Sequence, residues 1–517
     1  MFNLSTILES SARKTPNNTA FTFGTTHFSY AQINGAANQV ANGLLQSGIQ
    51  KGDKIALSCL NLPYFPIIYF GILKAGAVVV PLSVLLKKNE VEYHLKDSES
   101  KAYFCFIGND VLPMGERGYA GFCEAENCKN FYMIMPQPDM ASPIEQTKTL
   151  GMLMSGQSPV LESVMTSPND TAVIIYTSGT TGKPKGAELT HSNLFLNAQL
   201  SKDLFDMNSS DKCLVTLPLF HIFAMTTMMN AALLAGAEGV LLPRFDPKAV
   251  FDIMEKQGIT IFAGVPTMYW ALLNAKEQHP DLDFDKITQK LKVAVSGGAS
   301  LPVDVLESFE EKFNVKILEG YGMSEGSPVV TFNQTDVGCK PGSVGTPVWG
   351  VQVKLVDNEG NEVPQGEKGE LIYKGHNVMK GYYKKPEANA KTLKNGWLYS
   401  GDIAIKDEDG FYFIVDRTKD MIIRGGLNVY PREVEEVMIK HEKVSLVAVI
   451  GIPHPSHGEE IKAFVVLKPD MTLTEEELKM WTKERIADYK YPRVIEFMAA
   501  LPLSATGKIL KKELRKN

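Results

Sequence analysis

The sequence has few cysteines, no long block of charge of one sign and no uninterrupted apolar run long enough to cross a membrane. The six cysteines are scattered, and the neighbouring Cys123 and Cys128 lack the second Cys or His pair that a zinc site needs. We therefore expect reduced thiols and a cytoplasmic protein. The net charge of −6 argues against a nucleic-acid partner, because nucleic-acid surfaces need a basic patch.

The most apolar stretch, residues 64–86, is interrupted by Gly71, Lys74, Gly76 and Pro81. A membrane span needs about twenty apolar residues without such breaks, so the stretch predicts a buried helix followed by a strand. The N-terminus has no basic start before its apolar residues, which is not the pattern of a signal peptide. We expect no transmembrane segment. The sequence leaves open peripheral membrane association and the choice between a monomer and a homodimer.

The pattern of apolar residues predicts an α/β protein with more than one domain. Through the first 330 residues, short β-rich runs such as 54–59, 172–176 and 291–296 alternate with helical stretches, which indicates α/β layers with mostly parallel sheets. From about 340 to 416, glycine turns separate short strands and predict a β-rich subdomain. Residues 420–517 indicate a compact α+β unit, whose capping box at 474–477 opens a helix expected to reach about residue 488.

The run YTSGTTGKPKG at 176–186 is the most informative stretch. It follows an apolar β-like run and precedes a helical stretch that starts near Thr190, a strand–loop–helix layout that suits phosphate binding. Its glycines let backbone N–H groups face an anion, and its hydroxyls and lysines add donors and positive charge. A plain surface turn has a similar composition. Only two residues separate Gly179 from Gly182, so the loop is not a Walker P-loop.

With this loop, the sequence resembles the adenylate-forming superfamily of acyl-CoA synthetases, luciferases and peptide-synthetase adenylation domains. Four further segments match the superfamily's motifs in order: GYGMSE at 320–325, YSGD at 399–402, DRTKDMIIRGGLNVYP at 416–431 and ATGKI at 505–509. The resemblance runs from about residue 20 to 515. The segments LPLFHIF, GVPTMY, SGGAS and LEGYGMSE make bacterial medium- or long-chain fatty-acid–CoA ligases the most similar group.

The resemblance also divides the chain. It implies an AMP- and acyl-binding N-terminal domain at 1–416, a hinge at 417–419 and a mobile C-terminal domain at 420–517. Lys419 matches the family's hinge position. Gly425 and Gly426 interrupt a run that otherwise indicates a strand, and paired glycines let a narrow ligand pass close to the backbone. In the family this loop lines the pantetheine tunnel.

The implied chemistry explains why such a protein needs positive charge. A carboxylate acylates poorly because its leaving group would be oxide. In this family the carboxylate attacks the α-phosphate of ATP, pyrophosphate departs, and a thiol then expels AMP from the acyl group. The first step brings an anion up to a polyanion, so the site must supply cations and fixed donors. The resemblance therefore implies ATP, Mg²⁺, coenzyme A and a carboxylic acid as ligands.

The resemblance assigns catalysis to three residues. Lys508, in ATGKI, is the family's adenylation lysine, a compact point charge that bridges the substrate carboxylate and the α-phosphate. Glu325, at the end of GYGMSE, is the magnesium carboxylate and the expected metal ligand. His221, in LPLFHIF, resembles a gate or a residue beside the substrate carboxylate. Outside their motifs, Lys508 would be interpreted as a solvated charge and His221 as an ordinary core histidine.

The nucleotide contacts are spread over all five motifs. Asp402 would accept hydrogen bonds from the ribose hydroxyls, and Arg417 would reach the ribose or the α-phosphate. An ordinary salt bridge is the alternative for both. Tyr321 would stack on adenine, between backbone segments that glycine keeps open. The expected cofactor-binding residues are Thr177, Ser178, Gly179, Thr180, Thr181, Gly182, Lys183, Gly297, Gly298, Ala299, Glu319, Gly320, Tyr321, Gly322, Met323, Asp402, Arg417, Lys419, Gly425 and Gly426.

The acyl pocket implied by the resemblance, at 220–225, 265–268 and 326–328, is mostly apolar. It offers no acid to pair with a substrate ammonium, which argues against an amino-acid-activating domain. Met225, Met228 and Met229 can adapt to a flexible chain, although such residues are more often plain core. A medium- or long-chain fatty acid fits best. An aryl acid of the hydroxycinnamate type, a luciferase-like oxygenase and a non-catalytic nucleotide-binding module are the alternatives.

Overall fold

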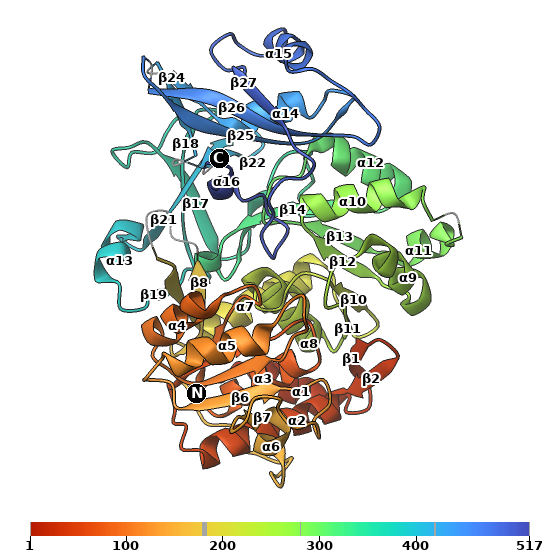
Figure 1. Ribbon diagram of the computed structural model, residues 1–517, viewed down its shortest axis with the longest axis vertical. Helices are drawn as coiled ribbons and strands as arrows, with labels where there is room; N and C mark the ends of the chain where they lie inside the picture. The colour runs from red at the N-terminus through yellow and green to blue at the C-terminus, as the bar shows by residue number, and fades with distance from the viewer. Residues whose placement is uncertain are drawn as a thin grey trace.

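The computed structural model describes residues 2–177, 183–279, 281–417, 420–425, 427–456 and 458–515. A large body of helices and sheets carries a smaller α+β unit, which stands at the top of Figure 1 and is built from the residues after 420. The C-terminal segment returns from the small unit to the junction between the two. The expected α/β class and the two-part architecture are therefore confirmed.

Over the described residues, the first sheet of the large body has the order β19-β9-β8-β4-β3-β5-β6-β7. Its strands from β8 to β7 pair in parallel, while β8 pairs antiparallel with β9 and β9 with β19. The bounds are β3 Lys54–Ser58, β4 Val78–Pro81, β5 Ser100–Phe106, β6 Asn130–Ile134, β7 Lys148–Thr149, β8 Thr171–Thr177, β9 Lys185–Thr190 and β19 Gly381–Tyr382.

The second sheet has the order β16-β15-β14-β13-β12-β10-β11-β1-β2 in the described part of the chain. Strands β14 to β1 are parallel, and both edges are antiparallel. The bounds are β1 Thr19–Phe23, β2 Thr26–Ser29, β10 Lys212–Val215, β11 Glu238–Leu241, β12 Ile261–Gly264, β13 Val293–Ser296, β14 Ile317–Gly322, β15 Val329–Phe332 and β16 Thr346–Pro347.

Helices surround both sheets, and the sequence of each helix explains how far it is buried and where it begins. Helix α3 (Tyr64–Lys74) is apolar nearly all round and is almost wholly buried, as such helices are. Helix α7 begins after Thr190, whose hydroxyl accepts the N–H of Asn193 while the Asn193 side chain accepts the N–H of Thr190. Besides α3, the helices of the large body are α1 Thr6–Lys14, α2 Tyr30–Gln46, α4 Lys88–Asp97, α5 Met114–Cys123, α6 Leu150–Met154, α7 His191–Leu204, α8 Ala231–Ala235, α9 Pro247–Gln257, α10 Pro266–Lys276, α11 Phe284–Lys290, α12 Val303–Phe313 and α13 Pro386–Thr392. A π-helix, η1, lies at Ala224–Asn230, and a 3₁₀ turn, η2, lies at Ser324–Gly326.

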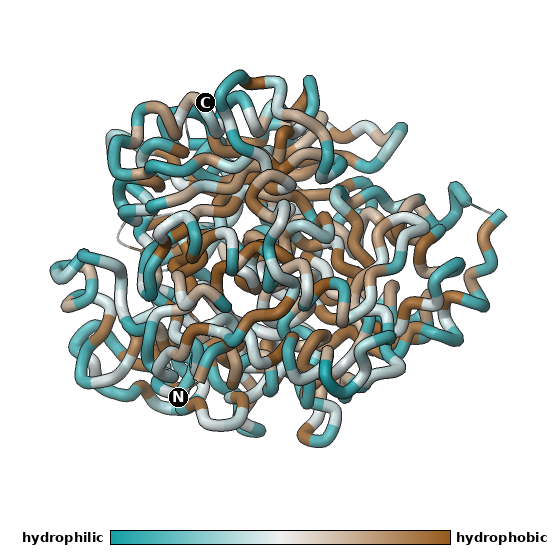
Figure 2. Tube along the Cα trace, turned by 90° about the horizontal axis from the view of Figure 1, so that it is seen from below, coloured by the Kyte–Doolittle hydropathy of each residue, from teal (hydrophilic) through white to brown (hydrophobic). Residues whose placement is uncertain are grey.

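The predicted β-rich subdomain and the small unit complete the chain. The subdomain is antiparallel and contains β17 Val351–Val356, β18 Gly369–Gly375, β20 Leu393–Lys394, β21 Trp397–Lys406 and β22 Tyr412–Arg417. The small unit contains β23 Ile422–Arg424, β24 Leu427–Val429, α14 Pro431–Met438, β25 Val444–His454, β26 Gly458–Leu467, α15 Glu475–Lys483, β27 Val494–Phe497 and α16 Lys511–Leu514. Figure 2 shows hydrophobic segments running through the interior and hydrophilic segments toward the rim.

Three local predictions were wrong. The helix expected near Thr190 is confirmed as α7, but the loop after β8 does not lead directly into it, because β9 intervenes and pairs with β8 with Thr177 opposite Lys185. The run around Gly425 is not one strand but a hairpin of β23 and β24, with Gly425 at φ +59°. Helix α15 ends at Lys483, because the Arg485 N–H bonds the carbonyl of Thr482 in a tight turn. Its predicted capping box at Thr474 and Glu477 is confirmed.

Candidate active site

Lys508 stands on a tight loop that the small unit presents to the large body. The loop closes on itself, since the Ser504 N–H bonds the Lys508 carbonyl at 2.8 Å and the Lys508 N–H bonds the Ser504 hydroxyl at 3.0 Å. Gly507 takes the left-handed turn position at φ +77°. Its carbonyl accepts the hydroxyl of Thr267, on α10 of the large body, at 3.0 Å. The loop is therefore docked across the junction of the two units.

The Lys508 side chain runs past Gly298, which follows β13. A Cβ at Gly298 would lie 3.0 Å from Lys508 Cε and 3.5 Å from Nζ, so only glycine leaves this passage open. Burial, together with the neighbouring charge of Arg417, lowers the pKa of Lys508 to about 8, while the charge of Asp402 opposes the shift. The structure thus brings together four expected site residues from separate motifs, namely Lys508, Gly298, Asp402 and Arg417.

Asp402 and Arg417 lie opposite each other on the paired strands β21 and β22. Arg417 Nε donates to Asp402 Oδ1 at 3.2 Å, and the Tyr321 hydroxyl donates to Asp402 Oδ2 at 2.5 Å. The carboxylate raises the pKa of Arg417. Asp402 is 7% exposed, whereas the Arg417 side chain is about half exposed. The pair therefore combines an anchored carboxylate with a guanidinium that still reaches solvent.

His221 lies beside Lys508, just before η1. Burial and the charge of Lys508 lower its pKa to about 3, so the ring is neutral at ordinary pH. Its Nδ1 accepts the N–H of Phe223 at 3.4 Å. A neutral ring beside a lysine ammonium can shape a pocket or exclude water. It cannot supply the positive charge that adenylation needs.

Helix η1, which follows His221 and Phe223 in the chain, is a buried and largely apolar segment. Its three methionines, Met225, Met228 and Met229, are buried, and π-helical turns are frequent at functional sites. The ring of Phe223 packs on Gly297, where a Cβ would lie 3.2 Å from it. Three buried side-chain oxygens have no hydrogen-bond partner among the described residues. Thr226 Oγ1 and Asn230 Oδ1 belong to η1, and Ser296 Oγ belongs to β13.

Glu325 lies in η2 and is 5% exposed. Its Oε1 accepts the Tyr382 hydroxyl at 2.7 Å, and the Nζ of Lys185 stands 4.3 Å from the centre of the Tyr382 ring. No group of three or more His, Cys, Asp and Glu side chains that could hold a metal ion occurs among the described residues. A single carboxylate nevertheless suits Mg²⁺, which is usually held by one or two carboxylates together with substrate phosphates.

The segment expected to bind phosphate joins β8 to β9, two strands that pair antiparallel. Thr177 is the last residue of β8, and Lys183 is exposed, with its Nζ 5.2 Å from the centre of the Tyr93 ring. Ser178, Gly179, Thr180, Thr181 and Gly182 lie outside the described residues, as do Lys419 and Gly426.

Other expected nucleotide contacts have structural roles of their own. Gly320 and Gly322 lie on β14, where its pairing with β15 leaves no room for a side chain. A Cβ at Gly320 would lie 2.3 Å from the Phe332 ring, and a Cβ at Gly322 would lie 2.0 Å from the Pro328 carbonyl oxygen. Glu319 is buried, its Oε1 accepts the Leu301 N–H at 3.0 Å, and burial raises its pKa to about 7. Ala299 precedes α12, and Met323 follows β14.

Comparison with known proteins identifies the family. Residues 8–383 match the AMP-binding enzyme family, and residues 433–508 match the AMP-binding enzyme C-terminal domain. The chain belongs to the AMP-binding enzyme family. The superfamily resemblance of the five motifs is thereby confirmed, and the protein is an adenylate-forming enzyme of the acid–CoA ligase class.

The relatives of this AMP-binding enzyme differ in their acids. The long-chain-fatty-acid–CoA ligase of Bacillus subtilis is 37% identical, over 99% of this chain and 94% of its own length. The feruloyl-CoA synthase of an Amycolatopsis species is 36% identical, over 98% and 97%. The crystal structure of the anthranilate–CoA ligase AuaEII with anthranoyl-AMP superposes with a TM-score of 0.91 at 31% identity, covering 100% of this chain and 97% of that one.

Two tyrosines of the AMP-binding enzyme were not found from the sequence. Tyr382 orders Glu325, and Tyr93 lies under Lys183. The only signal for Tyr382 is its place in a GYY run, and Tyr93 has none that distinguishes it from a helix-surface tyrosine. In the part of the chain that the structure describes, no helix has both the length and the apolar character that a membrane crossing needs.

Proposed function

We propose that the protein activates a medium- or long-chain fatty acid with ATP and transfers the acyl group to coenzyme A. The carrying observation is the position of Lys508, which docks beside Gly298, His221 and the Asp402–Arg417 pair. This arrangement supports the proposal, because a compact cation from the small unit is held beside the expected nucleotide residues, and such a cation can draw a carboxylate to an α-phosphate.

Each residue has a separate task in the first half-reaction. Lys508 draws the two anions together and stabilises the charge that develops on the α-phosphate oxygens. Arg417 and Asp402 bind the ribose side of the nucleotide, and the neutral ring of His221 excludes water. Glu325 would hold Mg²⁺, which neutralises phosphate charge when bound. Lys183, with the hydroxyl-rich segment before it, binds the β- and γ-phosphates that leave as pyrophosphate.

In the second half-reaction the small unit turns about the segment 417–419, so that Lys508 leaves and the hairpin around Gly425 approaches the acyl-adenylate. The thiol of coenzyme A attacks the acyl carbon, and AMP departs with the electron pair of the broken bond. The division into 1–416, 417–419 and 420–517 belongs to this proposal. We place the reaction in the cytoplasm, without requiring a partner protein.

The apolar character of η1 supports a fatty acid. Phe223 presents a ring without a hydroxyl, and no charged side chain belongs to the buried π-helix. An aryl acid is the second candidate, because the unpartnered oxygens of Thr226, Asn230 and Ser296 can bind a ring substituent. The feruloyl and anthranilate ligases among the relatives are also aryl-acid enzymes by name.

The deciding experiment measures pyrophosphate release with ATP, Mg²⁺ and coenzyme A against fatty acids of two to eighteen carbons and against ferulate, benzoate and anthranilate. The proposal expects kcat/KM to rise with chain length into the medium or long range. A higher kcat/KM for the aryl acids would contradict the fatty-acid substrate and support an aryl acid, the second candidate. Oxygen consumption with light emission, without thioester, would indicate a luciferase-like reaction instead.

A further inference from the structure

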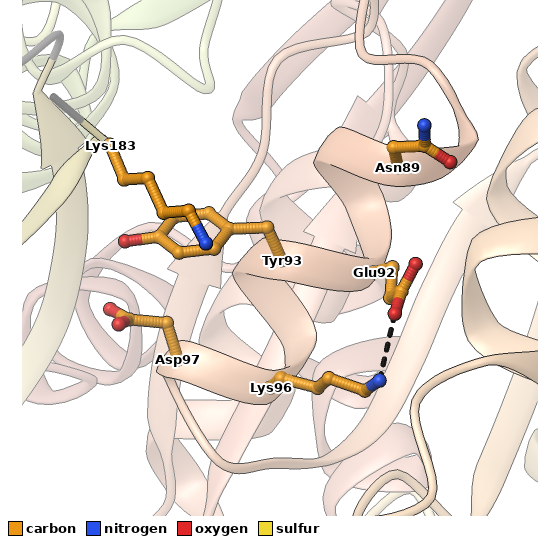
Figure 3. Close-up of a pocket in the computed structure, with 6 residues that line it drawn as sticks. All are labelled: Asn89, Glu92, Tyr93, Lys96, Asp97 and Lys183. Atoms are coloured by element: carbon orange, nitrogen blue, oxygen red, sulfur yellow. Dashed lines mark hydrogen bonds and ion pairs between the residues drawn. The ribbon is translucent and has the colours of Figure 1, made fainter.

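One surface helix, α4, holds both ends of the phosphate-binding hairpin. At the downstream end, the Tyr93 hydroxyl donates to the Pro184 carbonyl at 2.7 Å, and the Nζ of Lys183 stands 5.2 Å from the centre of the Tyr93 ring. Figure 3 shows the Lys183 side chain lying across this ring. One hydroxyl and one aromatic face thus hold two consecutive residues.

The upstream end is held one helical turn further along α4. Asp97 Oδ2 accepts the Tyr176 hydroxyl at 2.9 Å, while its Oδ1 accepts Lys385 Nζ at 2.6 Å. The Tyr176 ring packs edge-on against His94, with centroids 4.4 Å apart. Burial and the charge of Asp97 raise the pKa of Tyr93 to about 12, so its hydroxyl keeps the proton that it donates.

The charges around this contact leave Lys183 available to an anion. A pocket of about 490 Å³ opens beside it, lined by Asn89, Glu92, Tyr93, Lys96, Asp97 and Lys183. Lys96 pairs with Glu92 at 2.7 Å, and Asp97 is already paired with Lys385. Among the described residues, Lys183 has no carboxylate partner and lies on the Tyr93 ring, a contact that positions the ammonium without neutralising its charge.

Helix α4 is itself well anchored. At its start the Lys87 N–H donates to the Glu90 carboxylate. On its inner face its own side chains Val91, His94 and Leu95 are buried. Ordering a backbone segment costs conformational entropy, so a segment whose two ends are fixed in advance binds its ligand at a smaller entropic cost. The same contacts do not touch the AMP part of the site, where Lys508, Asp402 and Arg417 lie.

We propose that Tyr93 and Asp97 are positioning residues for the leaving pyrophosphate. They fix Lys183, Pro184 and Tyr176 on α4, and they thereby favour binding of the β- and γ-phosphates without affecting the AMP portion. The inference rests on the proposed role of this segment in ATP binding.

Titration calorimetry of MgATP and of AMP tests the inference. Tyr93→Phe removes only the hydroxyl, and Tyr93→Leu also removes the aromatic face. The expected result is a Kd for MgATP raised roughly 2- to 10-fold by Tyr93→Phe and more by Tyr93→Leu, with the Kd for AMP unchanged. The matched control is Tyr64→Phe, because the Tyr64 hydroxyl makes the same kind of bond to the Pro136 carbonyl at 2.9 Å, away from the loop.

The half-reactions give a second readout. Tyr93→Phe should raise the KM for ATP in pyrophosphate exchange and leave thioester formation from supplied acyl-adenylate at the wild-type rate. Equal weakening of MgATP and AMP, or unchanged binding of both, would overturn the inference. If the wild-type protein binds no MgATP at all, the proposed function fails with it, and that outcome is distinct because it does not depend on the variants.

Discussion

Lys508 meets two opposing demands. In the proposed function it must be charged to draw a carboxylate to a phosphate, yet it is buried, and burial with the neighbouring Arg417 brings its pKa down to about 8. The free protein therefore holds a lysine whose charge changes within the range in which enzymes are assayed. Polyanionic ATP would favour the charged form again once it binds.

The pH dependence of adenylation follows from this shift. Because the active form is the charged one, kcat/KM for ATP in pyrophosphate exchange should fall as pH rises through about 8, the value for the free protein. Lys508→Arg keeps its charge at these pH values. Whatever activity it retains should not fall between pH 7 and 9. A wild-type profile that stays flat to pH 9.5 would show that Lys508 is not the ionising group.

Tyr382 should control how Glu325 binds Mg²⁺. Its hydroxyl fixes one oxygen of Glu325 at 2.7 Å, and residues that orient a metal ligand typically contribute about 10- to 100-fold to affinity. Tyr382→Phe should raise the Kd of Mn²⁺ for the ATP complex, measured by electron paramagnetic resonance, and the Mg²⁺ concentration for half-maximal activity. Tyr383→Phe is the control, because it breaks a similar bond to Glu99 at 2.8 Å. If Tyr383→Phe weakened metal binding as much as Tyr382→Phe, the bond from Tyr382 to Glu325 would have no specific role in metal binding.

At this scale the sequence predicts residues that stand in a motif and misses those that support them. Lys508, Gly298 and Asp402 were named from their motifs, and the structure brings them together. Tyr93 and Tyr382 were not named, because a tyrosine that donates to a carbonyl or a carboxylate has no pattern of its own. Its role depends on a partner that is distant in the sequence.

Among the elements, the docked loop of Lys508 depends on glycine geometry. Gly507 is at φ +77°, and a Cβ there would lie 2.9 Å from Val265 Cγ2 and 3.0 Å from the Thr267 hydroxyl oxygen. The sequence identifies the motif at 505–509, but the loop that it forms and the side chains that it contacts on α10 depend on the fold.

Gly507→Ala should undock this loop and slow adenylation about tenfold or more, because the added methyl group displaces the contact with Thr267. Gly410→Ala is the matched control: Gly410 is at φ +88° with nothing within 4 Å of a Cβ, so it has the same backbone strain of about 1–2 kcal/mol without the clash. Pyrophosphate exchange and the melting temperature separate the two effects. If both variants lost the same activity, backbone strain alone would explain it.

The wrong predictions about elements have a common cause. The segment β9 mixes lysine, glycine and glutamate with apolar residues, so its local sequence does not indicate a strand. Pairing with β8 satisfies its backbone groups, and that pairing is a tertiary contact. Uniformly apolar helices such as α3 and apolar parallel strands such as β4 were predicted well, because their apolar residues alone require burial.

For the whole molecule, the proposed mechanism makes the junction between the units decide which half-reaction proceeds. The Lys508 loop binds α10 through Thr267, and the Arg432 N–H of the small unit bonds Asp416 Oδ2 of the large body at 3.1 Å. These contacts belong to the docked state and must break if the small unit turns. The motifs imply such a turn of the small unit, and the structure describes its docked arrangement on the large body.

Lys419→Pro tests the turn. Proline fixes φ near −65° and removes an N–H, so it should block rotation at the proposed hinge. Acyl-adenylate should still form, whereas thioester formation from supplied adenylate should be largely lost. Lys419→Ala leaves the backbone free and should retain both half-reactions. Normal thioester formation by Lys419→Pro would make the segment at 417–419 a passive linker.

The most direct measurement compares wild-type protein with Lys508→Ala in the two half-reactions, with products identified by mass spectrometry. The wild type should convert ATP, coenzyme A and a fatty acid to acyl-CoA, AMP and pyrophosphate. Lys508→Ala should lower acyl-adenylate formation about 10²- to 10³-fold, as expected for one lost electrostatic donor, and keep thioester formation from supplied adenylate. Lys512→Ala, an exposed neighbour, should behave as wild type. ADP and phosphate as products, or equal loss of both half-reactions in Lys508→Ala, would contradict the account.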